Sequence, residues 1–527
     1  MVAKVYTGTT NGIEGILVCV EADISDGLPS FDMVGYLGAE VKEARERVRT
    51  ALKNSGFRLP PSHITVNLSP ADLRKQGNYF DLPIALSVLA AAGFVRMDEL
   101  ENKIFIGELG LDGKIHPVNG TLVLAECGQK AGIKKAVVPK ENAKEAACLQ
   151  ETVVYGTKTL KEIVELLNNP DRLEENRQAV LYETSDKEDD SLDYDELYGQ
   201  ERMKRAAMVA SAGFHNLLYI GQPGSGKSMS AKRIPTIMPE MTYKEQLEVT
   251  KIYSVAGLLD YKEGLIKKRP FRSPHHTISA TALAGGGRFP RPGEISLAHH
   301  GVLFLDELAE FKRDTLEIMR QPLEDGKVTI SRVNGSCSYP AEFMLVAAMN
   351  PCPCGYFPDR SRCRCSVGEI RRYRDRISRP MLDRIDICTE AFAVKFDDLS
   401  KAKKGADSSS MRARVTEAIN RQRMRYKDDG ILFNSQLKGS RLSKYCNLDQ
   451  QKEELLRQAF ESMGLSVRAR DRILRVSRTI ADLEGSEQIK EAHLAEAISY
   501  RSIDRKYWGG YVKWSEKKHI TGVHAFR

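Results

Sequence analysis

The feature that most constrains this chain is a glycine-rich segment of eight residues, 221–228, that fits the pattern GxxxxGK[ST]. It follows the apolar run 217–220 and precedes a helical pattern, so a strand, a loop and a helix are expected in that order. Such a loop turns its backbone N–H groups towards phosphate oxygens, while its Lys supplies a cation and its Ser a hydroxyl for Mg²⁺. The segment predicts a nucleotide site in an α/β fold. Its members are Gly221, Gln222, Pro223, Gly224, Ser225, Gly226, Lys227 and Ser228.

Two further apolar runs end in polar residues that suit the same site. The run 302–305 leads into Asp306 and Glu307, and the run 343–349 leads into Asn350. In a fold of this type, Asp306 is expected to hold Mg²⁺, Glu307 to polarise the attacking water, and Asn350 to orient that water. The combination predicts a nucleotide hydrolase.

The length of 527 residues predicts several domains, because one domain ordinarily takes roughly 100–200 residues. Strand and helix patterns alternate in the first two units, acidic residues crowd the connection between them, and only helical patterns follow residue 411. The predicted fold class is α/β multidomain with a C-terminal helical unit. The expected divisions are 1–165, an acidic linker 166–192, 193–392, a linker 393–410, 411–505, and a tail 506–527 of unknown role.

Charge and composition exclude some alternatives. The net charge of +8 permits nucleic-acid binding without requiring it, and 42% hydrophobic residues exclude wholesale disorder. The start of the chain has no apolar signal segment, and the longest apolar stretch, 82–95, is too short to span a membrane. A cytoplasmic location, with reduced thiols and no membrane partner, is therefore expected.

Four of the ten cysteines are clustered in the sequence, as Cys352, Cys354, Cys363 and Cys365. Four thiolates suit a tetrahedral structural Zn²⁺, although one residue between paired ligands is tighter than the usual two to four. Zinc is the favoured interpretation, and free thiols or a redox disulfide stay open as alternatives.

The motifs together resemble the YifB/ComM family of magnesium-chelatase-like AAA+ ATPases, and the resemblance covers residues 1 to about 505. It implies ATP and Mg²⁺ as ligands, a hexameric ring, and helicase activity that drives branch migration of recombination intermediates during natural transformation. The segments that carry it are 200–228, 269–277, 292–299 with 306–307, and 350–355.

The resemblance also assigns arginines. Arg384 lies where a ring-forming ATPase extends an arginine finger into the neighbouring subunit, with Arg379 as the reserve candidate. Arg468, at the start of a predicted helix, is expected to reach the γ-phosphate, whereas Arg470 is interpreted as a solvated residue.

Two segments are candidates for contact with DNA. Residues 327–339 predict a β-hairpin with a turn at Asn334-Gly335, similar to the pre-sensor hairpin of related rings, and Arg332 on it could contact phosphates. In residues 269–300, Arg272, Arg288 and Arg291 accompany two pairs of adjacent histidines. DNA or subunit contacts are favoured over a metal site there, because no clear carboxylate or thiol completes a ligand set. The histidines are His275, His276, His299 and His300.

The first unit resembles a Lon-type protease domain in residues 107–114 and 131–142. Matching the segments around the Ser/Lys dyad of that family places Tyr79 at the serine position and Leu122 at the lysine position. Neither can form an activated pair, so no peptidase activity is expected and the unit is predicted to dock partners, such as recombination proteins.

Two alternatives to a DNA motor stay open. A chelatase motor subunit would use the same ATPase to insert Mg²⁺ into a porphyrin, although it is not expected to carry a Lon-like unit. A nucleotide-gated scaffold would recruit partners through residues 1–165 without acting as a motor.

Overall fold

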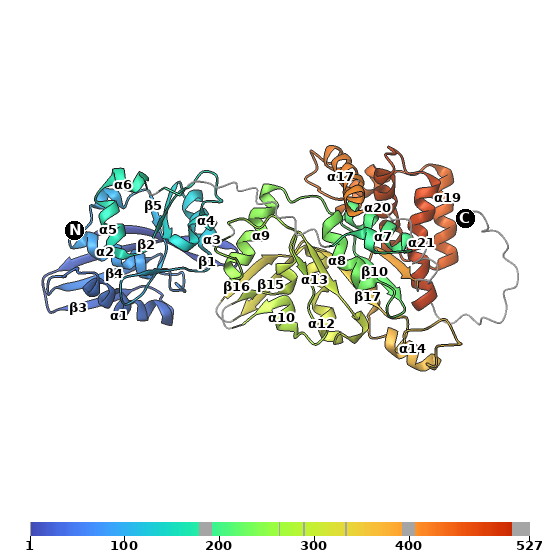
Figure 1. Ribbon diagram of the computed structural model, residues 1–527, viewed down its shortest axis with the longest axis horizontal. Coiled ribbons are helices and arrows are strands. Elements are labelled where there is room, and N and C mark those ends of the chain that lie inside the picture. Colours follow the sequence, from blue (N-terminus) through green and yellow to red (C-terminus); the bar gives the residue numbers. More distant parts are fainter. Residues whose placement is uncertain are drawn as a thin grey trace.

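The computed structural model has the N-terminal unit at one end of an elongated molecule, the nucleotide-binding unit in the middle and the C-terminal helices at the other end (Figure 1). Among the described residues, no helix is both long and apolar enough to cross a membrane. The structure describes residues 2–175, 177–178, 192–262, 264–287, 290–332, 335–392 and 406–508.

The N-terminal unit is a mixed seven-stranded sheet in the order β3-β4-β2-β1-β5-β8-β9. Strands β1, β2 and β4 pair antiparallel, and the remaining pairs are parallel. This confirms the α/β prediction for residues 1–165, whereas the Lon-like assignment stays a prediction. The strands are β1 (Ala3–Asn11), β2 (Glu14–Ser25), β3 (Ser30–Val34), β4 (His63–Ser69), β5 (Lys103–Phe105), β8 (Lys135–Pro139) and β9 (Val153–Thr157). The main helices are α1 (Ala39–Asn54), α2 (Asp81–Ala91), α3 (Thr121–Lys130), α5 (Leu160–Leu167) and α6 (Pro170–Glu175).

Helix α6 falls inside the predicted acidic linker 166–192. Its Leu173 is buried against the N-terminal core, so the N-terminal unit continues past residue 165. The acidic residues 179–191 lie outside the described part of the chain.

The middle unit is built on a five-stranded parallel sheet in the order β11-β14-β17-β10-β18. Its strands are continuous apolar runs because helices cover both faces, which confirms the three buried strands expected from the sequence. The strands are β10 (Leu217–Gly221), β11 (Phe271–Arg272), β14 (Val302–Leu305), β17 (Met344–Met349) and β18 (Ile387–Ala391). The longer helices are α7 (Glu201–Gly213), α8 (Lys227–Ile237), α9 (Tyr243–Ala256) and α14 (Val367–Arg374).

The predicted hairpin is present as β15 (Lys327–Arg332) and β16 (Gly335–Pro340). The register pairs Arg332 with Gly335, so Gly335 belongs to the strand and not to the turn. The other predicted turn residue, Asn334, lies outside the described residues. Val328, Ile330 and Tyr339 anchor the hairpin in the core on one face of the central sheet.

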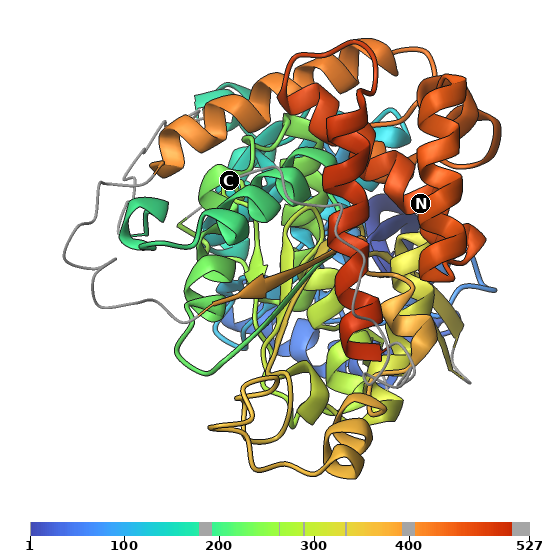
Figure 2. The same ribbon diagram turned by 90° about the vertical axis from the view of Figure 1, so that its right-hand side faces the viewer.

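The C-terminal unit is helical, as predicted, and shares a buried core with the middle unit. Figure 2 shows these helices in front of the edge of the central sheet. Helix α21 continues into the predicted tail as far as Trp508, and residues 509–527 lie outside the described chain. The helices are α17 (Ser408–Arg425), α18 (Gly439–Tyr445), α19 (Gln450–Met463), α20 (Val467–Leu483) and α21 (Glu491–Trp508).

Helix α9 joins the N-terminal and middle units. Its Lys251 forms an ion pair with Glu126 on α3, and its Ser254 donates a hydrogen bond to the buried carboxylate of Glu145. The hydroxyl of Tyr243 donates to the carbonyl of Cys148 over 2.6 Å. The units are therefore docked through specific polar contacts.

Candidate functional site

The glycine-rich loop lies at the carboxyl end of β10 and opens into α8, in the predicted order. Gly224 and Gly226 adopt φ angles of 76° and 83°, a region that glycine enters at little cost. A Cβ on Gly226 would lie 2.8 Å from Leu197, so this glycine also permits a close approach. The loop therefore ends at the N-terminus of α8, where backbone N–H groups would bind phosphate.

Lys227 is buried within this loop and bound to its own chain. Its Nζ donates to the carbonyls of Gly221 and Gln222, both at 2.8 Å, and to Oδ1 of Asn350 at 3.3 Å. Burial lowers the pKa of Lys227 to about 8, against the attraction of Asp306. The ammonium is therefore held in place, ready to meet an anion.

The two residues predicted to hold Mg²⁺ are in direct contact. The hydroxyl of Ser228 donates to Oδ2 of Asp306 over 2.6 Å, although 78 residues separate them in sequence. The other carboxylate oxygen of Asp306 accepts the backbone N–H of Glu307 at 3.0 Å. A hydroxyl beside a carboxylate, next to a phosphate-binding loop, fits the hard oxygen donors that Mg²⁺ prefers.

Glu307 directly follows Asp306 in an uncommon conformation. Its φ of 53° is left-handed, which for a non-glycine residue costs on the order of 1 kcal/mol and turns the side chain out of the strand direction. The carboxylate is 55% exposed and lies 3.3 Å from Nδ1 of His276. The sequence placed His276 among DNA or subunit contacts, and no spacing signal connected it to Glu307.

Asn350 lies at the carboxyl end of β17, as expected, but its amide oxygen accepts from Lys227. The sequence had placed this amide beside Glu307, where it would orient water. In the structure its hydrogen bond connects β17 to the phosphate-binding loop.

The predicted arginine finger lies away from this loop. Arg384 donates to the carbonyls of Arg320 at 3.1 Å and Pro380 at 2.6 Å, and it forms an ion pair with Glu324. Arg384 and Arg468 line the same cleft of about 740 Å³. Burial, together with the nearby Arg468 among other charges, lowers the pKa of Arg384.

This cleft lies at the opposite edge of the central sheet from the phosphate-binding loop. Its lining includes Asn216, Phe343 and Asp386, which directly precede β10, β17 and β18. Strand β10 has five residues, so the two edges are about 17 Å apart at about 3.3 Å per residue. The structure brings Arg384 and Arg468 together, but not to the loop of their own chain.

The alternatives to these two arginines make other contacts. Arg379 donates to the carbonyl of Trp508 over 3.0 Å, which attaches the end of α21 to the residues just before Arg384. Arg470 forms ion pairs with Glu453 at 3.4 Å and Asp471 at 3.7 Å on the surface.

The candidates for DNA contact are dispersed. Arg272 forms a bidentate ion pair with Glu294 at 2.6 and 2.7 Å, so its guanidinium is engaged within the chain. Arg291 is exposed in the short strand β13 (Arg291–Pro292). Arg288 lies outside the described residues, and for Arg332 the structure describes the backbone only.

His299 and His300 are buried, which departs from the expectation of DNA or subunit contacts. Both imidazoles contact Glu248, at 3.3 and 2.8 Å. The backbone N–H of Glu342 donates to Nδ1 of His299, so Nε2 carries the proton and has no lone pair for a metal ion. Burial lowers the pKa of His299 to about 4, whereas the hydrogen bonds from both histidines lower the pKa of the Glu248 carboxyl well below its usual range. The three side chains form a hydrogen-bonded support beside the start of β14.

Comparison with known proteins agrees with this geometry. Residues 193–399 match the family model described as magnesium chelatase, subunit ChlI, and residues 405–501 match the model of the ChlI C-terminal part. The competence protein ComM of Haemophilus influenzae is 41% identical over 505 residues, covering 95% of this chain and 98% of that protein. An uncharacterized protein YifB of Salmonella typhimurium is 41% identical over 504 residues, covering 95% and 97%.

The chain belongs to the YifB/ComM family. Membership of this magnesium-chelatase-like AAA+ family indicates nucleotide and Mg²⁺ as ligands, in agreement with the contacts of Lys227, Ser228 and Asp306. Similarity to chelatases themselves is weaker: a magnesium-chelatase 38 kDa subunit of Cereibacter sphaeroides is 25% identical over 243 residues, covering 42% of this chain and 70% of that subunit. The N-terminal unit of this family member also matches a model, at residues 20–142, that is described as subunit ChlI of Mg-chelatase.

Proposed function

We propose that the chain is one subunit of an ATP-driven ring motor that acts on branched or single-stranded DNA and promotes branch migration in recombination and natural transformation. The observation that carries the ATPase part is the meeting of Lys227, Ser228 and Asp306 at the carboxyl edge of the central sheet. Lys227 and the loop N–H groups hold the β and γ phosphates. Ser228 and Asp306 hold Mg²⁺, whose charge offsets that of the phosphates.

Glu307 supplies the general base in this proposal. Its carboxylate accepts a proton from the attacking water, and His276 at 3.3 Å fixes its orientation until substrate is bound. Asn350 binds Lys227, so it positions the ammonium and, with it, the γ phosphate.

The position of the two arginines supports a ring. Arg384 and Arg468 line a cleft at the amino edge of the sheet, about 17 Å from their own phosphate-binding loop by the length of β10. If these residues assist hydrolysis, the nucleotide they serve is bound to another copy of the chain. We therefore propose a homo-oligomer, with six subunits by analogy to related rings.

Action on DNA is supported by the similarity to a protein whose name refers to competence. The net charge of +8 and the hairpin β15–β16 are compatible with it. Arg332, next to the hairpin tip, and the exposed Arg291 are the proposed phosphate contacts.

ATP hydrolysis by the purified protein tests the proposal, measured without DNA, with a single strand and with a four-way junction. Stimulation by the junction, with displacement of its arms in the same reaction, is the expected result. Glu307→Gln is the blank, because it removes the base and leaves nucleotide binding intact. Turnover indifferent to every DNA at two salt concentrations would overturn the DNA assignment.

A chelatase-type motor is the second candidate, because residues 20–142 match a model named for subunit ChlI. Because of this match, the presence of the N-terminal unit is a weaker argument against a chelatase function. The same assay distinguishes the candidates, since a chelatase motor has no reason to respond to DNA.

We propose no peptidase activity for the N-terminal unit, and a role in docking recombination proteins. The hydroxyl of Tyr79 is buried and hydrogen-bonded to Thr9 at 3.1 Å, and Leu122 is fully buried. Neither position offers a nucleophile with an adjacent lysine. Casein hydrolysis by the wild type that Lys227→Ala abolishes would contradict this.

A further inference from the structure

The four clustered cysteines lie in a long segment without regular structure. Residues 350–366, between β17 and α14, form neither helix nor strand. Connections of more than about 12–15 residues are uncommon in compact domains, and something must hold them in place. Its apolar contacts are few: Cys352, Cys363 and Ile370 form a small buried cluster of their own.

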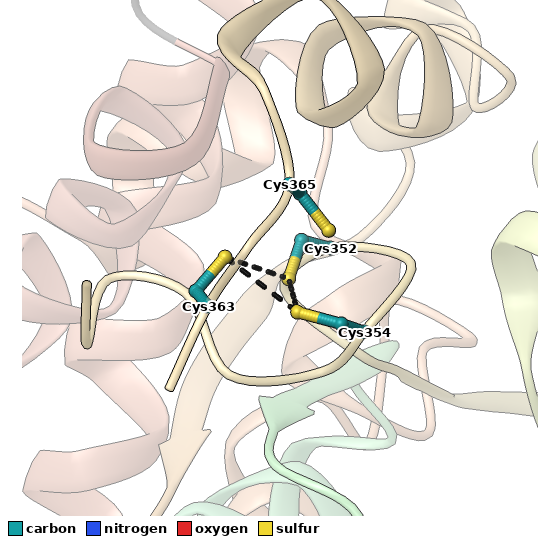
Figure 3. Close-up of side chains that lie close together, drawn as sticks. All are labelled: Cys352, Cys354, Cys363 and Cys365. Carbon is teal, nitrogen blue, oxygen red and sulfur yellow. Dashed lines mark hydrogen bonds between the residues drawn. The ribbon is translucent and has the colours of Figure 1, made fainter. Parts of the chain in front are cut away.

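The four sulfur atoms converge on one point, as Figure 3 shows. All four lie within 4.8 Å of one another. The distances between Sγ atoms are 3.4 Å for Cys352 and Cys354, 3.7 Å for Cys352 and Cys363, and 3.6 Å for Cys354 and Cys363. A tetrahedral Zn²⁺ with Zn–S bonds of about 2.3 Å separates its sulfur ligands by about 3.8 Å, close to these values.

The alternatives fit this arrangement less well. A disulfide joins two sulfur atoms at about 2.0 Å, whereas here three are mutually close at 3.4 to 3.7 Å, and none of the four is in a disulfide. An iron–sulfur cluster places inorganic atoms between its ligands, and sulfur atoms within 4.8 Å leave room for a single ion. Four thiolates with no open position are typical of structural zinc.

The surroundings of the cluster suit a negatively charged centre. The backbone N–H of Phe357 donates to Sγ of Cys352 at 3.4 Å, the kind of outer contact that orients a metal ligand. Arg360 lies 5.1 Å from the ring of Phe357, Arg362 lies 4.1 Å from the ring of Tyr356, and Arg360 also donates to the carbonyl of Cys365 at 3.0 Å. Arg360 and Arg362 thus bring positive charge to the segment that carries the four thiols.

We propose that Cys352, Cys354, Cys363 and Cys365 bind one structural Zn²⁺, and that this ion holds residues 350–366 against the phosphate-binding loop, so that its loss weakens nucleotide binding. The metal part rests on the sulfur geometry alone. It does not depend on the proposed action on DNA.

The segment touches the phosphate-binding loop at two places beyond Asn350. A Cβ on Gly355 would lie 2.5 Å from Cδ of Pro223, so the bare backbone of Gly355 packs against that proline. Nη1 of Arg362 donates to the side-chain oxygen of Gln222 at 3.4 Å. Both contacting residues lie between zinc ligands, so their positions depend on the ion.

The metal is tested by elemental analysis of the full-length protein, purified without added metal. We expect about one zinc per chain, retained in Cys19→Ser and lost in the double variant Cys354→Ser/Cys365→Ser. Cys19 is a matched control because it lies in the N-terminal sheet. A folded wild type, verified by circular dichroism, that holds no zinc or holds iron instead would overturn the assignment.

The coupling is tested by titrating a fluorescent ATP analogue before and after removal of zinc with a chelator. We expect the dissociation constant to rise at least fivefold and to recover when Zn²⁺ alone is returned. Arg362→Ala should keep its zinc and raise the dissociation constant by about twofold, whereas Arg371→Ala, on the exposed face of α14, should change neither. Zinc that can be removed with no change in affinity would leave a metal site but refute its effect on the loop.

Discussion

The two edges of the central sheet differ in how complete they are. At the carboxyl edge, Lys227 is hydrogen-bonded to Asn350 and Ser228 to Asp306, all within one chain. At the amino edge, Arg384 and Arg468 line a cleft of about 740 Å³. One edge holds the candidate nucleotide site, and the other places two arginines away from it. If the proposed ring forms, each chain contributes half of two different sites.

The largest effect is expected at the carboxyl edge. Lys227→Ala removes the ammonium that meets the phosphates and should abolish nucleotide binding, with turnover reduced by about 10³-fold or more. Equilibrium binding of a fluorescent ATP analogue measures it. Lys232→Ala is the matched control, because Lys232 is exposed on the same helix. Unchanged affinity in Lys227→Ala would show that the carboxyl edge is not the nucleotide site.

The amino edge should show a loss of hydrolysis without a loss of binding. Arg384→Ala is expected to lower turnover by roughly 10³-fold, the lower end of what arginine fingers contribute in GTPases, while ATP affinity stays within about twofold. Arg379→Ala is the control.

Mixing the two inactive variants sharpens this prediction. In a mixed ring, an intact phosphate-binding loop from Arg384→Ala can face an intact Arg384 from Lys227→Ala, so activity should return. Mixtures that stay inactive although both variants assemble would mean that the two edges do not meet between subunits.

The buried state of Lys227 predicts a dependence on pH. Burial lowers its pKa to about 8, and bound phosphate raises it again, so above pH 8 binding must take up a proton. Affinity should be constant below about pH 7.5 and fall as pH rises through 8, by up to about tenfold per unit. Lys227→Arg should bind more weakly but give a flat profile. A flat profile for the wild type would show that Lys227 does not titrate near pH 8 in the free protein.

The smallest effect is expected at the contact between His276 and Glu307. His276→Ala frees the carboxylate from a partner at 3.3 Å, and basal turnover without DNA should rise about two- to fivefold. His275→Ala is the control, since its Nδ1 contacts Thr277. A fall in turnover with unchanged ATP affinity would mean that His276 supports Glu307 instead of restraining it.

The sequence predicted the elements whose signals are local. The loop 221–228, the strands that end at Asp306 and Asn350, and the hairpin all carry patterns of spacing and polarity that few other structures satisfy. The N-terminal α/β sheet and the C-terminal helices were predictable for the same reason.

The rest depends on contacts between distant segments. Nothing in the spacing of His276 places it beside Glu307, and nothing near Asn350 indicates that its amide binds Lys227 instead of lying beside Glu307. His299 was expected to contact DNA or another subunit, yet its hydrogen bonds to Glu248 and Glu342 let it be buried. Tertiary pairing, which no local pattern encodes, decided these cases.

Helix α9 provides a mechanical connection between the N-terminal and middle units. Besides contacting Glu126 and Glu145 of the N-terminal unit, it carries Glu248, which binds His299 and His300 just before β14. One helix therefore connects the N-terminal sheet to the strand that ends at Asp306. If the chain is cleaved between residues 179 and 191, the two fragments should stay associated through the contacts of α9. Any tilt of α9 would also rotate the N-terminal unit, because that unit is attached to the helix.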